Sequence, residues 1–594
     1  MDLSSILLFE VSWEVCRQIG GIYRVIRTKA PVMKQLFGTN YCLIGPDFFE
    51  QSNLEFEEMA PYGVYQKALE KYWSLGFRAR FGKWLITGSP NVILIDYLSQ
   101  FHRIQEYKYY FWVDHGIETP DEMWVNDSVL FGYQVATLIE MFANVINEEG
   151  NSLQLITHFH EWNVGSTIPI LRKRQVKTKI VFTTHATLLA RYIAPTVDNI
   201  YEYMKYIDPY EEARRLNIFS QYLIERASAY GADVFTTVSD ITAEETKYLL
   251  HKSVHLVTPN GLNIQKFVVA HEHQNLHGLF KAKIHDFITG YFFPYYTFDL
   301  DKTLYIFISG RYEFRNKGID MFIDALPILN EKIQKNQLSV TVVAFIITKA
   351  ATLGYRYEVL QNRFIFEELQ NATMRISQNI PQRLLQQLVE APNIQPQQLL
   401  TESELVYLKR IYYSWKRKGL PSVVTHEMVH PNDIILNYIY KNQLFNQKEL
   451  AVKVVYHPDF ISEFGSIIKI DYMDFIRGTH LGVFPSYYEP WGYTPMECTA
   501  AGIPSISSDW TGFSSFLQEQ LPNHDEYGIF ILPRKSLSYW DSVHLLADKI
   551  YSVISMSRRE RIELRNKVES VSSIFDWSNL IKYYLQAYKL ALSK

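Results

Sequence analysis

Short apolar runs alternate with helical patterns along about the first 260 residues of the chain. Apolar residues recur at helical spacing between the runs, and turn residues separate the segments. The predicted strands are 6–9, 92–96, 155–159, 180–184 and 234–238, and the predicted helices are 25–37, 128–147, 211–230 and one that begins at Ser239. Strands that alternate with helices are typical of a doubly wound α/β domain with a mostly parallel sheet.

The same alternation restarts after a helical segment, 270–293, that is rich in histidine and lysine. It is then interrupted for about 90 residues, far longer than an ordinary connection. Within the interruption, residues 355–419 follow a helical pattern, and Thr401 and Glu404 are placed as a capping box. The predicted strands of this second α/β region are 304–309, 340–348, 452–456, 481–484 and 529–532. We expect the long helices of the interruption to form an oligomer contact.

The composition narrows the class of protein. With 594 residues the chain is too long for one core. Lys and Arg total 59 against 63 Asp and Glu, so no overall basic field attracts nucleic acid or an anionic membrane. Three cysteines without metal-like spacing indicate a reducing compartment. We find no leader and no run of about 18 uncharged apolar residues, which predicts a cytoplasmic enzyme without a membrane span.

The stretch 481–498 contains the densest set of side chains able to bind a ligand. A predicted strand stops at Pro485, and Glu489, Gly492, Pro495 and Glu497 follow in a turn and a helix start. In α/β proteins ligands bind at such strand ends. The aromatic residues of the stretch suit a sugar or nucleotide pocket. The alternative is that they belong to the core and that the glutamates are solvated.

Other strand ends carry further candidates. Gly20 and Gly21 precede a helix and indicate a phosphate loop or a plain tight turn. His185 and Arg191 follow a strand and could meet a sugar and a phosphate, or be a core histidine and a surface arginine. The loop 310–318 presents three cations, of which Arg311 and Lys317 suit a diphosphate, whereas a solvated loop explains Arg315 equally well.

Two polar clusters allow more than one interpretation. His158 and His160, at i and i+2, lie on one side of a strand beside Glu161, but no third metal ligand is visible at helical spacing. We therefore interpret them as polar groups positioned at a strand end. Near the C-terminus, Arg558, Arg561 and Arg565 form a cationic stripe on a predicted helix. Such a stripe is either an anion site or a solvated face.

Seven motifs spread over nearly the whole chain are similar, in order, to those of glycogen synthases of the eukaryotic type. They are E-V-S-W-E-V with G-G-I-Y, H-F-H-E-W, F-T-T-H-A-T-L-L-A-R-Y, V-S-D-I-T-A-E, T-P-N-G-L-N, G-R-Y-E-F-R-N-K-G and P-S-Y-Y-E-P-W-G-Y-T-P-M-E-C. The resemblance implies a GT-B fold, in which two Rossmann-like domains face each other across a cleft. It implies retaining transfer of glucose from UDP-glucose to the 4-hydroxyl of a glucan chain end, without a metal or other cofactor.

With this resemblance, the chain divides into domains. They are a first domain at 1–265, a helical bridge at 266–299, a second domain at 300–575 with a helical insertion at 354–445, and a closing helix at 576–594 that returns to the first domain.

The resemblance also implies roles for individual residues. Glu489 is expected at the donor glucose, and Arg311 and Lys317 at the departing diphosphate. His185 and Arg191 are expected at the glucose and a phosphate. The other implied donor-binding residues are Gly20, Gly21, Asn260, Tyr472 as the ring that stacks on uracil, Tyr493, and Glu497 as the ribose ligand.

Regulation and assembly follow from the same resemblance. A site for the activator glucose-6-phosphate is implied at His271, Gln274, His277, Lys281, Arg561 and Arg565. The helical insertion resembles the element that builds a homotetramer, and glycogen and a glycogenin-like primer protein are the implied partners.

Some positions depart from the family pattern. Gln18 stands where the family has a lysine, so a donor-side cation is either absent or supplied by another residue such as Arg17. Ala190 replaces a glycine, and Lys567 and Ser570 replace arginines. The chain stops at Lys594, without the phosphorylated tail of mammalian and fungal members, so control by tail phosphorylation is not expected. Gln18 motivates one alternative, a UDP- and glucan-binding subunit that has lost turnover. A phosphorylase is the other, although no stretch resembles its pyridoxal-phosphate lysine site.

Overall fold

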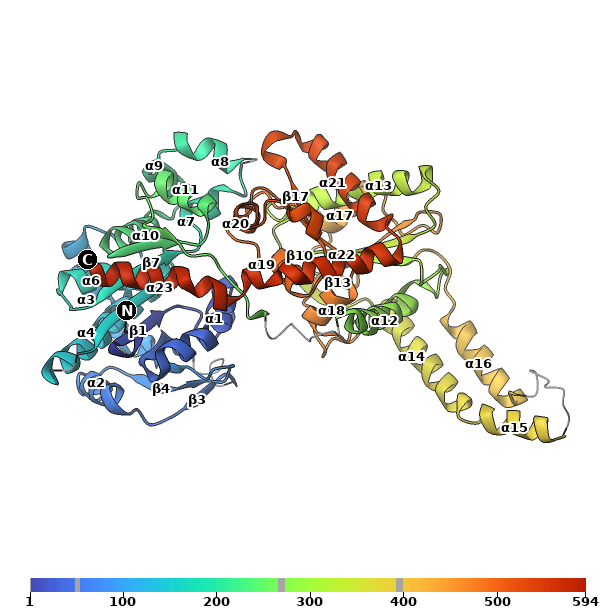
Figure 1. Ribbon diagram of the computed structural model, residues 1–594, viewed down its shortest axis with the longest axis horizontal. Coiled ribbons are helices and arrows are strands. Elements are labelled where there is room, and N and C mark those ends of the chain that lie inside the picture. Colours follow the sequence, from blue (N-terminus) through green and yellow to red (C-terminus); the bar gives the residue numbers. More distant parts are fainter. Residues whose placement is uncertain (1, 49–53, 151, 198, 265–272, 391–398) are drawn as a thin grey trace.

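A computed structural model describes residues 2–48, 54–150, 152–197, 199–264, 273–390 and 399–594. The two α/β regions of the sequence form two domains, each with its own sheet and apolar core. The first sheet is mostly parallel, with antiparallel pairs at its β3–β4–β5 edge. A third apolar cluster joins the domains and contains Trp491 and Phe513 from the second and Val25 from the first. The fold class predicted from the sequence is confirmed (Figure 1).

The first sheet is centred on β1 (Ile6–Val11), whose residues are all buried. Side chains buried on both faces produce the uninterrupted apolar run seen in the sequence. The strands lie in the order β3 (Phe56–Glu58), β4 (Ala79–Trp84), β5 (Asn91–Ile95), β2 (Tyr41–Pro46), β1, β6 (Gln154–His160), β7 (Lys179–Thr184), β8 (Val234–Thr237) and β9 (Leu256–Val257). Strands β1 to β5 build one half of the sheet and strands β6 to β9 build the other, so the strand order reverses between the neighbours β1 and β6.

The second sheet is parallel in every described pairing. Its order is β14 (Val452–His457), β11 (Thr341–Thr348), β10 (Thr303–Gly310), β15 (Leu481–Phe484), β16 (Ser505–Ser508) and β17 (Ile529–Leu532). The strand order reverses between β10 and β15. Open α/β sheets bind ligands outside such switch points, at the carboxyl ends of the strands.

One predicted helix is wrong in its extent. The segment 211–230 is not continuous, because α9 (Pro209–Arg215) ends before α10 (Phe219–Gly231) begins. Asn217 between them has φ 55°, a left-handed conformation that a helix interior does not contain. Strands β2, β3, β4, β9 and β16 were not predicted, nor was the short antiparallel pair of β12 (Thr352–Tyr355) and β13 (His426–Met428).

Helix α4 (Met123–Glu148) is the described helix that is long and apolar enough to cross a membrane by length and composition. The helix meets these criteria with Asp127 and Glu140 inside it, so it is not the uncharged apolar run considered in the sequence. However, 78% of its most apolar window is buried inside the protein, where it covers the first sheet. It therefore serves as a core helix.

The interruption of the second domain forms a helical arm that extends away from both sheets (Figure 1). Its helices are α14 (Tyr357–Ser377), α15 (Ile380–Glu390) and α16 (Glu402–Trp415). The predicted capping box is confirmed, since Glu404 N–H donates to Thr401 Oγ1 at 3.2 Å and Thr401 N–H donates to Glu404 Oε2 at 2.8 Å. Phe366 and Trp415 stack between α14 and α16 with ring centroids 5.5 Å apart.

The last helix, α23 (Trp577–Ser593), crosses from the second domain to the first and packs on the first sheet (Figure 1). The Trp577 indole donates to Thr28 Oγ1 at 2.8 Å, and the Tyr588 hydroxyl donates to Glu10 Oε1 at 3.2 Å. The end of the chain thereby completes the core around β1.

Candidate active site

Loops from the carboxyl ends of both sheets meet at the junction of the two domains. Ser239, at the start of α11 (Asp240–Leu249), donates to the Pro490 carbonyl at 2.7 Å. The Tyr488 hydroxyl donates to Glu245 of the same helix at 3.3 Å. The stretch 485–492, singled out in the sequence, therefore contacts the first domain directly.

The end of β15 is held by the neighbouring loop after β10. Gly318 has φ 71°, and a Cβ there would lie 2.2 Å from the Pro485 carbonyl oxygen, so only glycine fits. Arg534, a buried cation, donates to the same oxygen at 2.9 Å and lies 3.6 Å over the Tyr487 ring. These contacts fix the backbone that leads to Glu489.

Glu489 forms an ion pair with Lys317, which comes from the loop after β10. Their side chains are 20% and 14% exposed, so the pair is largely shielded from water but open on one side. Arg311 on the same loop is 73% exposed and pairs with Glu313 at 2.9 Å. Arg315 lies 5.5 Å over the Tyr487 ring. The structure thus places a cation against the central carboxylate and a second cation on an exposed rim.

The aromatic residues of this stretch serve a different purpose from the one expected. Tyr487, Tyr488 and Trp491 are buried, and Tyr487 donates to Asp320 at 2.9 Å. Trp491 packs against Phe516 in the apolar cluster between the domains. These rings hold the loop in place, as the alternative interpretation proposed. That alternative is wrong for the glutamates, which are paired and shielded rather than solvated.

Glu497 and Tyr493 lie on α19 (Tyr493–Ala500), next to Tyr472 at the start of α18 (Tyr472–Gly478). Burial raises the pKa of Glu497, while Arg24 opposes the rise. The Tyr472 hydroxyl is 2.6 Å from Ser309 Oγ at the end of β10. The three residues expected at the nucleotide therefore gather beside the β10–β15 switch point.

His185 and Arg191 are brought together by Glu161. The Glu161 carboxylate accepts from the His185 backbone N–H at 2.9 Å and from Arg191 Nη2 at 2.7 Å. Burial lowers the pKa of the His185 imidazole well below its usual range, so the ring is neutral and acts by hydrogen bonding. Its Nε2 is 3.1 Å from His160 Nδ1. The two residues share one carboxylate, and their roles at a sugar and a phosphate stay predictions.

The glycine pair opens α1 (Gly21–Phe37), and its backbone is already bound. Glu14 Oε2 accepts from Gly20 N–H at 2.7 Å and from Tyr23 N–H at 3.0 Å. The carboxylate therefore occupies the position at the helix start where an anion would bind. Asn260, after β9, is buried, and its Oδ1 has no hydrogen-bond partner among the described residues.

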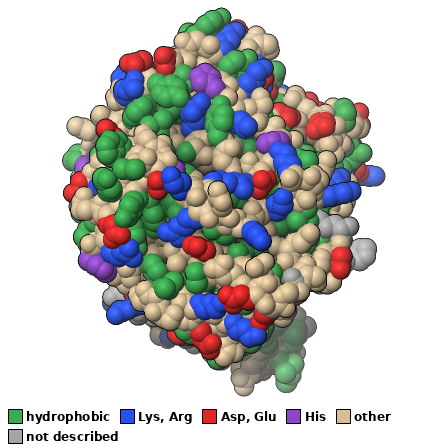
Figure 2. Space-filling view, turned by 90° about the vertical axis from the view of Figure 1, so that its left-hand side faces the viewer, with side chains coloured by type: hydrophobic (Ala, Val, Ile, Leu, Met, Phe, Trp, Pro, Cys, Tyr) green, Lys and Arg blue, Asp and Glu red, His purple; other side chains and the backbone are tan. Residues whose placement is uncertain are grey.

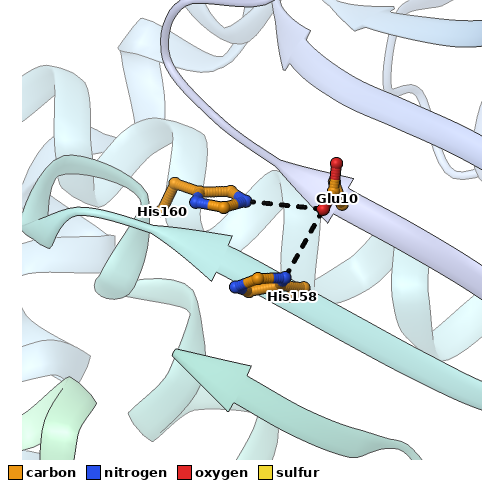
Figure 3. A group of neighbouring side chains, drawn as sticks. All are labelled: Glu10, His158 and His160. Carbon is orange, nitrogen blue, oxygen red and sulfur yellow. Dashed lines mark ion pairs between the residues drawn. The ribbon is translucent and has the colours of Figure 1, made fainter. Parts of the chain in front are cut away.

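His158, His160 and Glu10 form a buried group whose ligand atoms lie within 4.8 Å of one another (Figure 3). Three such groups could hold a metal ion. However, Glu10 Oε1 already binds Lys29 Nζ at 2.6 Å, and Glu10 Oε2 accepts from the Tyr41 hydroxyl at 2.6 Å. A metal ion here would lie next to a buried ammonium. We therefore interpret the group as a polar support beneath His185.

The residues expected at an allosteric anion site also come together. Arg565 of α22 (Arg558–Val571) donates to Gln274 Oε1 at 2.6 Å on α12 (His273–Phe292), and His277 lies one turn further along α12. Burial, together with the neighbouring charge of Arg561, lowers the pKa of Arg565 to about 10. Burial also lowers the pKa of Lys281, again with a contribution from Arg561. His271 lies outside the described residues.

Cavity size and surface charge do not mark the site. A cavity of about 790 Å³ lies at the amino ends of β6 and β7, lined by Leu155, Arg172 and Lys179, and holds none of the candidates. On the outer face of the first domain, positive and negative side chains are interspersed (Figure 2). The candidate site is defined by converging loops instead.

Several residues at the junction were not predicted. Arg24 lies in the first turn of α1, and its Nη1 forms an ion pair with Glu497. Glu161, Glu245 and Arg534 support His185, Tyr488 and Pro485 respectively. Glu161 has φ 75°, and only its place in the H-F-H-E-W motif pointed to it. Arg24 and Glu245 lie in helical patterns that carry no local signal. Arg534 follows β17 after one proline, and no motif marked it.

Two Rossmann-like domains meet through loops at the carboxyl ends of their sheets, with a paired carboxylate and lysine in one and a neutral buried histidine in the other. This arrangement defines a glycosyltransferase of the GT-B type. The catalytic domain of starch synthase IV from Arabidopsis thaliana has the same fold, with a TM-score of 0.51 and 13% identity over the full length of both chains. The chain belongs to the glycogen synthase family, whose sequence model matches residues 10–594.

Two relatives show how far the similarity extends. The chain is 41% identical to glycogen [starch] synthase of Neurospora crassa, over all of this chain and 84% of that protein. It is 40% identical to glycogen [starch] synthase isoform 1 of Saccharomyces cerevisiae, over all of this chain and 87% of that one. Matches of this length favour an active synthase over an impaired binding subunit.

Proposed function

We propose that the protein transfers glucose from UDP-glucose to the non-reducing 4-hydroxyl of an α-1,4-glucan, such as glycogen, with retention of configuration. The observation that carries this proposal is the Lys317–Glu489 pair at the second switch point, facing the first domain. The neutral His185 and Arg191 supply hydrogen bonds and charge from that domain.

The chemistry requires charge stabilisation more than an acid and base pair. As the bond from glucose C1 to the phosphate oxygen breaks, negative charge develops on the diphosphate, and Lys317 and Arg311 stabilise it. The acceptor O4 bonds to C1 from the same face, and its proton passes to the departing phosphate oxygen. Glu489 orients Lys317 and the donor glucose. No cofactor is needed for these steps.

Incubation with glycogen and labelled donor tests the proposal. We expect elongation with UDP-glucose and little with ADP-glucose, and we expect Glu489→Gln to lower the turnover number about 100-fold or more, because the lysine and the sugar lose their common partner. Glutamine keeps the size of the side chain. If the parent does not elongate glycogen and Glu489→Gln is no worse, the protein is the impaired UDP- and glucan-binding subunit instead.

We also propose that glucose-6-phosphate activates the enzyme at the site of Gln274, His277, Lys281, Arg561 and Arg565. Cations that depress one another's pKa are a costly arrangement without an anion. A phosphate dianion would relieve this repulsion and accept from several N–H groups at once.

Replacement of both Arg561 and Arg565 by alanine is expected to abolish the activation while leaving the basal rate in place, because the phosphate loses its two arginines. The rate with and without glucose-6-phosphate measures the effect. Arg559→Ala is the matched control, since Arg559 on the same helix pairs with Glu563 and is exposed. Activation that survives the double substitution intact means that the activator binds elsewhere.

Assembly and location complete the proposal. We infer a homotetramer that uses the helical arm, where Leu385, Val389 and Tyr413 are exposed apolar side chains. A glycogenin-like primer protein is a further partner. The cysteines are free and buried, which suits the reducing cytoplasm.

A further inference from the structure

The cations near the first glycine turn are arranged in a way that the sequence did not indicate. Position 18 is a neutral glutamine, and the Arg17 guanidinium lies 4.0 Å over the Phe48 ring, within the first domain. Arg24, one turn into α1, instead reaches the second domain and pairs with Glu497. Among the described residues of this turn and the start of α1, the cation that reaches the nucleotide side is therefore Arg24.

Two buried oxygen atoms beside the Arg24–Glu497 pair have no hydrogen-bond partner among the described residues. Glu497 is 3% exposed, and its second oxygen, Oε2, has no hydrogen-bond partner among the described residues. The buried Tyr493 hydroxyl beside it also lacks a described partner. A buried acceptor without a donor is costly, so this position suits a ligand that brings hydroxyl groups.

Arg24 is the more exposed member of the pair. Its side chain is 37% exposed, whereas Glu497 is enclosed. Arg24 also lies within electrostatic reach of Tyr472, the residue expected under the base. A ribose joined to a diphosphate carries the hydroxyls that Glu497 can accept from and the anion that Arg24 can bind.

We propose that Arg24 is a donor-binding residue that exchanges partners when a nucleoside diphosphate sugar binds. The inference rests on the proposed function. Ribose hydroxyls donate to Glu497, and the released guanidinium donates to the diphosphate, whose geometry matches its planar fork. Arg24 thereby supplies the positive charge that Gln18 lacks. Without donor, the Arg24–Glu497 pair links the two domains.

Binding of UDP and of uridine to the full-length protein tests the exchange by calorimetry. We expect Arg24→Gln to weaken UDP binding about 10- to 100-fold, the range for a hydrogen bond to a charged group, and to change uridine binding little. A purely structural role would weaken both ligands alike. Arg24→Lys is expected to retain most of the affinity, and Arg17→Gln is the matched control.

A second substitution tests whether a cation at position 18 can replace Arg24. Gln18→Lys in the Arg24→Gln protein is expected to restore much of the preference for UDP over uridine, because the lysine returns a cation near the diphosphate. If the parent prefers UDP and Arg24→Gln keeps the full preference, or binds UDP more tightly, the inference about Arg24 is wrong while the proposed function stands. If the parent does not bind UDP, both fail.

Discussion

Replacement of Lys317 by alanine is expected to lower the turnover number with UDP-glucose and glycogen about 100- to 1000-fold. The lysine faces the central carboxylate from the loop after β10, in a position shielded from water. Its charge is needed most when the glucosyl bond breaks, so the KM for UDP-glucose should rise much less than the turnover number falls. Steady-state rates at saturating glycogen measure both quantities.

Lys335→Ala is the matched control for this change, because Lys335 is exposed at the far end of α13 (Ile319–Lys335), the helix that Lys317 precedes. It should leave both constants unchanged. A Lys317→Ala enzyme that folds normally and turns over within about threefold of the parent would remove Lys317 from the charge-stabilising role.

Replacement of Lys29 by methionine is expected to lower the free energy of unfolding by about 3–5 kcal/mol. Lys29 and Glu10 are fully buried, with 2.6 Å between Nζ and Oε1. The Lys29 ammonium also lies 4.0 Å over the Tyr584 ring of α23. Loss of the lysine leaves a buried carboxylate without its countercharge. Denaturant unfolding measures the change.

The double substitution Glu10→Gln with Lys29→Met separates the charge from the packing. It removes both charges, so we expect it to recover more than half of the lost stability. Lys589→Met, at an exposed position of α23, is the control and should have little effect. A double variant that is less stable than Lys29→Met would contradict the explanation, because the cost would then not come from an unpaired carboxylate.

Whether a strand was predicted from the sequence depended on whether its buried residues are apolar or polar. Strands β15 and β17 were predicted residue for residue, because both are apolar runs between turn residues. β16 was missed because it reads Ser-Ile-Ser-Ser, although every residue is buried. Two of its serines find partners inside the protein: Ser507 Oγ lies 2.8 Å from Ser514 Oγ, and Ser508 Oγ donates to the Ser486 carbonyl at 2.5 Å. Ser505 Oγ is buried without a partner among the described residues. A buried polar strand of this kind has no hydrophobic pattern to detect.

In the candidate site, sequence-based prediction failed for residues whose partners lie far away in the sequence. Glu489, Lys317 and His185 were predicted because each follows a strand and belongs to a motif. Arg24 and Glu497 lie 473 positions apart, and nothing near Arg24 in the sequence marks its contact. Glu10 and Lys29 look like a strand glutamate and a helix lysine, and only the packed domain shows that both are buried. Contacts between segments that are distant in the sequence determine whether such residues are buried and with which residues they pair.

The return of α23 to the first sheet has a consequence for how the protein is made. Tyr588 completes the hydrogen bonds of Glu10, and Trp577 and Tyr584 cover Lys29 in the same core. During translation, β1 and α1 leave the ribosome before the second domain, whereas Tyr588 follows Glu10 by 578 residues and leaves after that domain. The first domain can therefore reach its final core only after the second domain has been synthesised, and the two domains must mature together.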